Sequence, residues 1–138
     1  MLKTRPAKEV MVRMRNEIGA LDTLAKTIAD KGANILAVSA WVDGAQGVIH
    51  LVTDDSVRVI DALRARGYDA RETNVLVTEM PHKPGMLRRV TEKLAQGDID
   101  IHHLYATATV TQDQCLLVFA TANNDRAMVL LNASPSAP

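Results

Sequence analysis

An internal repeat limits the possible folds of this chain more than any other feature of its sequence. A shift of 66 positions places Gly19 on Gly85 and Leu21 on Leu87. Further coincidences are Met14 with Met80, Ile28 with Leu94, Ile35 with Ile101 and Ala40 with Ala106. The order of secondary-structure signals is also the same in both halves, so we expect two copies of one supersecondary unit of about 60 residues each.

The first half predicts the order strand, helix, strand, strand, helix, strand. Its strands are expected at 9–14, 34–42, 47–53 and 68–74, and its helices at 18–31 and from Asp54 or Asp55 to Gly67. Asp43-Gly44 is a turn dipeptide between two strands, which indicates a hairpin. The inward faces of the two helices are predicted to carry Ile18, Leu21, Leu24, Ala25 and Ile28, and then Val57, Ile60, Ala62 and Leu63.

The second half predicts most of the same order. Strands are expected at 75–80, 101–110 and 115–120, with a turn at 111–113, and helices at 84–95 and 122–131. No fourth strand follows, and 133–138 is small, polar and proline-rich, which is typical of a disordered tail. The predicted units are therefore 1–74 and 75–132.

These elements predict an α+β fold of two tandem ferredoxin-like βαββαβ sandwiches, the second without its last strand. Each has an antiparallel sheet with helices on one face. Without a fourth strand, Val75–Glu79 would have an open, apolar edge. The stretch Tyr68–Glu79 could serve both units, or a second chain could cover the edge. We expect a homodimer or larger oligomer that buries on the order of 1,600 Å² or more.

Composition argues against several classes of protein. Sixteen basic and sixteen acidic residues give a net charge of zero, so there is no general attraction to nucleic acid or to an anionic membrane. Aromatic residues make up 3%, which disfavours the base-stacking platforms of RNA-binding sheets. No apolar run reaches the length of a membrane span, and no signal peptide is indicated. The single cysteine, Cys115, fits a reducing compartment, and a cytoplasmic location is expected.

The segment Lys83-Pro84-Gly85-Met86-Leu87, followed by an aliphatic helix and Asp98–Ile101, resembles the ACT domain. The first half has its counterparts in Asn16–Leu21 and Gly32–Ile35. The resemblance covers nearly the whole chain as a tandem pair. It implies a regulatory protein of amino-acid metabolism that binds a small molecule, expected to be an amino acid, and acts through association with itself or with an enzyme. We expect no catalytic activity and no cofactor.

The two loops are also plausible sites on physical grounds. Pro84 is expected at the first position of a helix, and glycine lets the backbone approach a ligand. A helix N-terminus presents N–H groups that attract a carboxylate, and the Asn16 side chain offers an oxygen to an ammonium group. ACT domains commonly have Asp where this chain has Asn16 and His82. The predicted ligand-binding residues are Asn16, Glu17, Ile18, Gly19, Ala20, Asn34, Ile35, His82, Lys83, Pro84, Gly85, Met86, Leu87, Asp100 and Ile101.

Each of these predicted functional residues also has an explanation that involves structure alone. Pro-Gly after a strand is a good start for any helix, and Asn34 and Asp100 could be ordinary turn residues. Residues His102 and His103 point to opposite faces of a strand, so with Cys115 they do not form a closed metal site. No nucleophile has visible partners, and we expect no enzyme activity. The alternative function is an assembly or regulatory subunit of an amino-acid-metabolism enzyme that binds no ligand.

Overall fold

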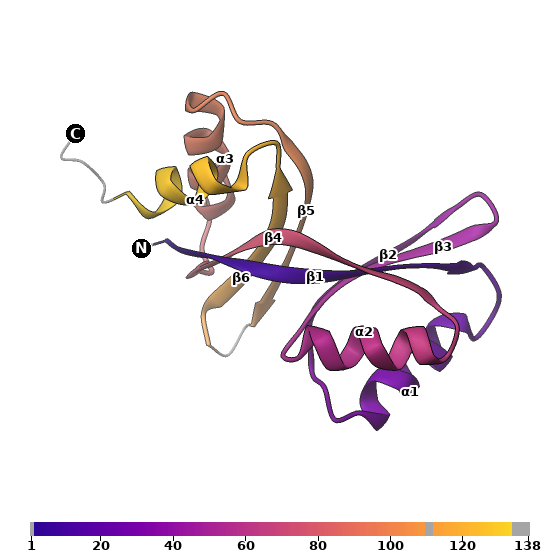
Figure 1. The fold of residues 1–138 in the computed structure, drawn as a ribbon. Helices are drawn as coiled ribbons and strands as arrows, with labels where there is room; N and C mark the ends of the chain where they lie inside the picture. Colours follow the sequence, from indigo (N-terminus) through magenta and orange to yellow (C-terminus); the bar gives the residue numbers. More distant parts are fainter. Residues whose placement is uncertain (1, 110–111, 134–138) are drawn as a thin grey trace. The chain divides into compact units, whose positions relative to one another are not determined.

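The computed structural model describes residues 2–109 and 112–133 (Figure 1). The strands are β1 (Lys3–Arg15), β2 (Ile35–Asp43), β3 (Gln46–Thr53), β4 (Asp69–Pro81), β5 (Ile101–Thr109) and β6 (Gln114–Thr121). The helices are α1 (Ala20–Asp30), α2 (Ser56–Ala65), α3 (Met86–Gln96) and α4 (Asn124–Asn132). The fold is α+β, with an antiparallel sheet in the order β2-β3-β1-β4-β6-β5.

The chain forms two compact units. We call Lys8–Thr73 the N-terminal unit, and the residues up to Ala7 together with those from Asn74 onward the C-terminal unit. The N-terminal unit contains α1, α2, β2, β3 and the adjoining parts of β1 and β4. The C-terminal unit contains α3, α4, β5, β6 and the other parts of β1 and β4. The predicted turn at 111 and tail at 134–138 lie outside the described residues, as does the end of the predicted strand at 110.

Strand β4 is one continuous strand of 13 residues, where the sequence predicted separate strands at 68–74 and 75–80. No glycine or proline interrupts it before Pro81, and Asn74 stays extended between its two halves. The two halves belong to different units. One long strand therefore serves both units, which was one of the two possibilities that the sequence left open.

The prediction of an open edge at Val75–Glu79 is wrong. Lys3–Ala7 at the start of β1 belongs to the C-terminal unit and supplies its fourth strand, next to β4. The hydroxyls of Thr4 and Thr78 lie 2.8 Å apart and are buried. The predicted boundary of 1–74 for the first unit is corrected accordingly. Pro6 and the charged residues around it concealed this strand, because proline within a short run argues against a strand.

The side chain of Asn132 at the end of α4 holds this N-terminal strand in place. Its amide nitrogen donates to the Thr4 carbonyl oxygen at 2.7 Å, and its amide oxygen accepts from the Thr4 N–H at 2.9 Å. One side chain thereby satisfies both backbone groups of a strand residue.

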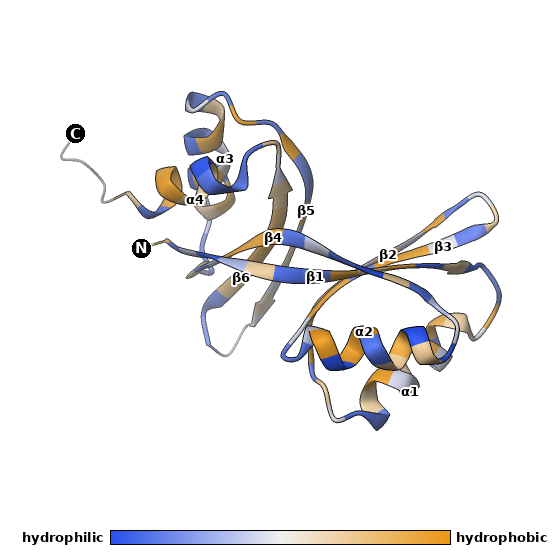
Figure 2. Cartoon of the chain, viewed as in Figure 1, coloured by the Kyte–Doolittle hydropathy of each residue, from blue (hydrophilic) through white to orange (hydrophobic). Residues whose placement is uncertain are grey.

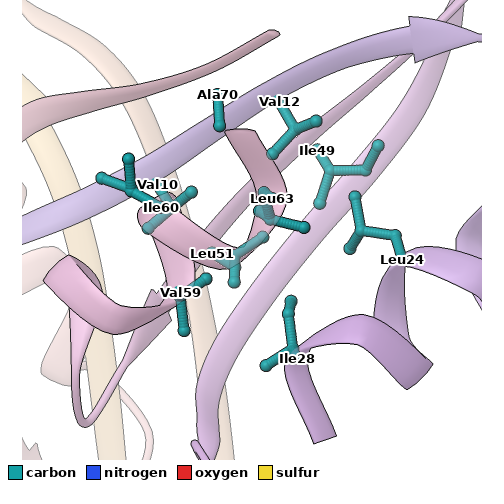
Figure 3. Packing of buried hydrophobic residues seen from close by; sticks show 10 residues of the cluster. All are labelled: Val10, Val12, Leu24, Ile28, Ile49, Leu51, Val59, Ile60, Leu63 and Ala70. Carbon is teal, nitrogen blue, oxygen red and sulfur yellow. The ribbon is translucent and has the colours of Figure 1, made fainter. Parts of the chain in front are cut away.

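The core of the N-terminal unit lies between its strands and its two helices (Figure 3). Its buried members are Val10, Val12, Leu24, Ile28, Ile49, Leu51, Val59, Ile60, Leu63 and Ala70. The predicted inward positions Leu24, Ile28 and Leu63 are at most 1% exposed. The predicted positions Ile18, Leu21 and Val57 are 106%, 49% and 65% exposed, and Val59 is buried in place of Val57.

Polar side chains determine where α2 begins. Asp55 is its N-cap, and its carboxylate accepts from the Arg58 N–H at 3.1 Å, while Asp54 turns away to Asn34. The sequence left the choice between the two aspartates open. Figure 2 shows polar and apolar residues alternating around α2, as expected for a helix that covers a sheet with one face.

The core of the C-terminal unit is built in the same manner from β4, β6, α3 and α4. Its buried members are Leu76, Met80, Met86, Val90, Leu94, Ile99, Leu117, Phe119, Ala127 and Leu131. Asn123 caps α4 by accepting from the Arg126 N–H at 3.1 Å. Among the residues that the structure describes, no helix has the length and apolar character required to cross a membrane.

Candidate functional site

The two predicted loops fold into the same tight turn immediately before a helix. The Ala20 N–H donates to the Glu17 carbonyl oxygen at 3.1 Å, and the Met86 N–H donates to the Lys83 carbonyl oxygen at 3.4 Å. Both third residues, Gly19 and Gly85, have φ of 87°. These are the hydrogen bond and dihedral angle of a type II turn, which requires positive φ at its third position.

Positive φ, rather than a close approach of the backbone, explains the two glycines within this chain. A Cβ at either position would meet no heavy atom of the described residues within 4 Å. The prediction that Pro84 occupies the first position of a helix is wrong, because α3 begins at Met86. Pro84 is instead the second residue of the turn, where its fixed φ is favoured.

Each turn leaves the N-terminus of its helix uncapped by side chains. Gly19 is the N-cap of α1 and makes no side-chain hydrogen bond to it. The Thr23 N–H donates to the Gly19 carbonyl oxygen at 3.0 Å, so helix geometry gives the N–H groups of Leu21 and Asp22 no carbonyl within the helix. With the helix dipole, this end of α1 favours an anionic group such as a carboxylate.

A pocket of about 410 Å³ lies at the first turn, and all of its lining belongs to the N-terminal unit. The lining residues are Met14, Arg15, Asn16, Glu17, Gly19, Ala20, Leu21, Asp22, Ala40, Trp41, Val42 and Ile49. We call this space the Asn16 pocket. It combines the start of α1 and several polar side chains with an apolar wall from β2 and β3.

A second hollow of about 410 Å³ shares the same loop. Ile18, Thr23 and Tyr68 line it, together with residues of the Asn16 pocket such as Glu17 and Gly19. The loop from Arg15 to Ala20 is therefore accessible from two hollows. The Asn16 N–H donates to the Ala45 carbonyl oxygen at 3.0 Å, which anchors the start of this loop to the β2–β3 hairpin.

The structure does not bring Asn34 and Ile35 into the Asn16 pocket. The backbone N–H and side-chain amide of Asn34 donate to the two carboxylate oxygens of Asp54, at 2.9 and 2.8 Å. These hydrogen bonds lower the pKa of the Asp54 carboxyl group below its ordinary value. Asn34 therefore has a structural role in joining the start of β2 to the start of α2.

Replacement of Asn34 by alanine is expected to raise the pKa of Asp54 toward its ordinary value, since the amide donor is lost. A carboxyl group with a lowered pKa stabilises the fold above its ordinary pKa, and this contribution is lost as the pH falls through the lowered value. An NMR titration of the Asp54 carboxyl carbon measures the change, with Asn16→Ala as the control. An unaltered Asp54 titration in Asn34→Ala would contradict this account.

The second loop differs from the first at the residue after glycine. Met86 is 3% exposed and packs into the core of the C-terminal unit, whereas Ala20 in the corresponding place is half-buried and lines the pocket. His82 is exposed, and its backbone N–H donates to the Asp113 carbonyl oxygen at 2.8 Å. Lys83, Pro84 and Gly85 are exposed as well, and Leu87 is 48% exposed.

Asp100 immediately precedes β5 and Ile101 is its first residue, and neither of them lines the Asn16 pocket. The Asp100 carboxylate lies 3.5 Å from the His102 ring, and its carbonyl oxygen accepts from the Ala122 N–H at 3.0 Å. Ile101 is half-buried and packs against the C-terminal core. On β6, burial raises the pKa of the Cys115 thiol, which keeps it protonated and weakens it as a nucleophile.

Sequence reasoning missed the apolar wall of the Asn16 pocket. Met14, Ala40, Trp41, Val42 and Ile49 were assigned to strands but not to a site. Pairing of Ala40 with Ile49 across the β2–β3 hairpin places their side chains on the face that α1 covers, whereas the Trp41 side chain lies on the opposite face and stacks on His50.

No protein-family model matches the chain, and no curated protein matches it. Several solved structures are similar to the chain. Protein BT0572 from Bacteroides thetaiotaomicron is 21% identical with a TM-score of 0.86, over 93% of this chain and 88% of that one. The ligand-free regulatory subunit of aspartate kinase from Thermus thermophilus is 10% identical with a TM-score of 0.67, over 94% and 93%. A structure of aspartokinase α and β subunits is 14% identical with a TM-score of 0.64, over 94% and 93%.

At these identities the similarity concerns the fold alone. Several of the similar structures are regulatory subunits or domains of aspartate kinase. The fold of this chain is therefore the same as theirs, with a six-stranded antiparallel sheet and four helices in the described residues.

Proposed function

We propose that this chain is a regulatory protein that binds a small molecule, an amino acid, in the Asn16 pocket and has no catalytic activity of its own. The observation that carries this proposal is the composition of the pocket. An uncapped helix start, carboxylate and amide side chains and an apolar wall line one space of about 410 Å³. Small-molecule sites combine an apolar lining with a few polar groups in this way.

Each part of an amino acid has a matching group in the pocket. The N–H groups at the start of α1 suit the carboxylate, since they lack partners within the helix. The side-chain oxygens of Asn16, Glu17 and Asp22 suit the ammonium group, which can only donate. The second loop has His82 and Lys83 in place of Asn16 and Glu17, so it favours an anion if it binds any ligand.

A regulatory role is supported by the fold and by the names of its structural neighbours. Two of them are regulatory subunits of aspartate kinase. Regulation would work by linkage, because a ligand that prefers one arrangement of the protein raises the population of that arrangement. The partner that receives the signal would be a second copy of this chain or an enzyme.

Calorimetric titration with each of the proteinogenic amino acids tests the proposal. We expect at least one to bind, and we expect Asn16→Ala to weaken that binding by about tenfold to a hundredfold, since a lost hydrogen bond to a charged group costs about 1.5–3 kcal/mol. His82→Ala is the matched control and should leave binding within about twofold. If no amino acid binds, or if only His82→Ala abolishes binding, the proposal for this pocket is wrong.

Self-association is also expected, although not through the edge that the sequence indicated. Strand β2 ends the sheet order, and its side chains Leu36, Val38 and Val42 are 43%, 51% and 57% exposed. An exposed apolar edge strand favours pairing with another chain. Sedimentation at micromolar concentration should give a homodimer or a larger oligomer. A monomer that stays monomeric when amino acids are added would contradict this expectation.

The exposed β2 side chains also support the alternative, an assembly subunit that binds no ligand. Such a protein would associate but would not respond to any amino acid in calorimetry. The two experiments together therefore separate a ligand-dependent regulator from a purely structural partner.

A further inference from the structure

We propose that two copies of this chain associate by placing the helix-start turn of the N-terminal unit of one copy against the corresponding turn of the C-terminal unit of the other. The contact is made by two surfaces of four exposed residues each. The first face consists of Glu17, Ile18, Leu21 and Asp22, and the second face consists of Lys83, Pro84, Leu87 and Arg88. The inference rests on the self-association expected above and names the surfaces that meet, but it does not require a bound ligand.

The two faces have the same local shape. Each is formed by a type II turn with a glycine φ of 87° and by the start of a helix of 11 residues. The shift of 66 positions that relates the two halves of the chain places every residue of the first face on one of the second. A contact between the two faces can therefore have the local two-fold character of a contact between identical surfaces.

Equivalent charged residues of the two halves are opposite in sign. Glu17 corresponds to Lys83, and Asp22 corresponds to Arg88. The reversal continues along the adjoining strand and helix, where the further pairs are Arg13 with Glu79 and Lys26 with Glu92. Wherever 8–31 and 74–97 both carry a charge at equivalent positions, the sign differs, so the first face is acidic and the second is basic.

These signs favour contact between unlike faces. Close to a two-fold axis, each residue of a symmetric contact lies near its own equivalent, so two first faces would bring Glu17 and Asp22 against carboxylates. Against a second face, the same carboxylates meet Lys83 and Arg88. Glu17, Asp22 and Lys83 form no salt bridge within the described residues, and that of Arg88 is 3.9 Å long and exposed. The charges therefore select the unlike pairing and disfavour the like one.

An exposed leucine lies at the same place in each face. Leu21 is 49% exposed and Leu87 is 48% exposed within the single chain, so a surface from outside the chain is needed to cover them. Ile18 beside the first leucine is fully exposed, and Pro84 beside the second is exposed as well. Each face thus has apolar side chains flanked by charges, which is the usual arrangement of a protein interface.

A second copy supplies everything that this contact needs, because each chain carries both a face and its complement. If a two-fold axis brings the first face of one copy to the second face of its partner, the same rotation brings the remaining two faces together. Both faces of each chain are then covered, and the assembly closes as a dimer with two equivalent contacts.

Charge reversal in the whole chain, measured by sedimentation without added amino acid, tests the inference. Glu17→Lys with Asp22→Lys makes both faces basic, and Lys83→Glu with Arg88→Glu makes both acidic. Each double variant is expected to raise the dissociation constant of the dimer at least about tenfold, because attraction becomes repulsion in both contacts. An equimolar mixture of the two double variants regains two complementary contacts and should dimerise within about threefold of the wild type.

Asp61→Lys with Asp69→Lys is the matched control, since it changes the net charge by the same amount as the basic double variant at exposed positions outside both faces. It should dimerise within about threefold of the wild type. A chain that carries all four reversals should do so as well, and its dimerisation also shows that the reversed side chains are compatible with folding. Without any substitution, the dissociation constant of the wild-type dimer should rise with salt concentration, because salt screens exposed charges.

A dimer that neither double variant weakens, or a mixture that stays monomeric, would overturn the inference while self-association stands. A dissociation constant that does not rise with salt would overturn it in the same way. A wild-type chain that is monomeric would overturn both the inference and the expected self-association. Amino-acid binding is decided separately by the calorimetric titration, so it can stand or fail independently of these results.

Discussion

Truncation of Leu24 to alanine is expected to lower the free energy of unfolding by about 2–5 kcal/mol. Leu24 is 1% exposed and belongs to the core cluster beneath α1. Removal of its branched end takes away apolar contacts and leaves a cavity that the surrounding strands can only partly fill. Urea unfolding followed by the fluorescence of Trp41, the single tryptophan, measures the change.

Leu21→Ala is a matched control for this measurement, because the same atoms are removed three positions earlier on the same helix. Leu21 is 49% exposed, so the expected loss of stability is about 0.5 kcal/mol or less. Because Leu21 also lines the Asn16 pocket, its truncation should act more on ligand binding than on stability. Similar losses of stability in the two variants would contradict the helix orientation described above.

Deletion of the residues up to Ala7 is expected to destabilise the C-terminal unit by about 3 kcal/mol or more. The deletion removes a strand beside β4 and leaves the Thr78 hydroxyl and the Asn132 side chain without the hydrogen bonds to Thr4. Each net hydrogen bond contributes about 1 kcal/mol, and an unsatisfied buried group adds to the loss. Amide hydrogen exchange of β6, Gln114–Thr121, measures the stability of this unit.

Two point variants distinguish the effect of losing the strand contacts from the effect of shortening the chain. Asn132→Ala keeps the strand but loses both hydrogen bonds to the Thr4 backbone, so faster exchange in β6 is expected, by a smaller factor than in the deletion. Arg5→Ala changes an exposed residue of the same segment and should have little effect. Unchanged exchange in the deletion variant would show that Lys3–Ala7 does not stabilise the C-terminal unit.

Local chemistry accounts for the parts of the candidate site that could be predicted from sequence. The loops at Gly19 and Gly85 were predicted from their matched place before a helix in the two halves, and the structure shows that both are turns with positive φ at the glycine. The helix that follows each turn was expected from its apolar spacing, and Leu24, Ile28 and Leu63 were placed correctly in the core. These features depend on residues that are near one another in the chain, so the sequence contains the information directly.

Contacts between residues that are distant in sequence determine the remaining features of the fold and of the candidate site. Spacing alone could not distinguish Leu24 from Leu21, since both lie on the same side of a predicted helix, yet they are 1% and 49% exposed. The hydrogen bonds from Asn34 to Asp54 join residues that are far apart in the chain, and no local pattern indicated them. The apolar wall that Ala40, Val42 and Ile49 give to the Asn16 pocket depends on the register between β2 and β3, which periodicity does not specify.

The sequence by itself determined an α+β chain with two similar helix-starting turns and apolar helix faces, because periodicity and turn chemistry are local properties. Only the tertiary structure decided which strand completes the C-terminal unit. Lys3–Ala7 and Asn132 are far apart in sequence, and a segment containing Pro6 has little strand propensity of its own. Its place follows from the hydrogen bonds and burial that β4 and α4 provide, and these arise only when the whole chain has folded.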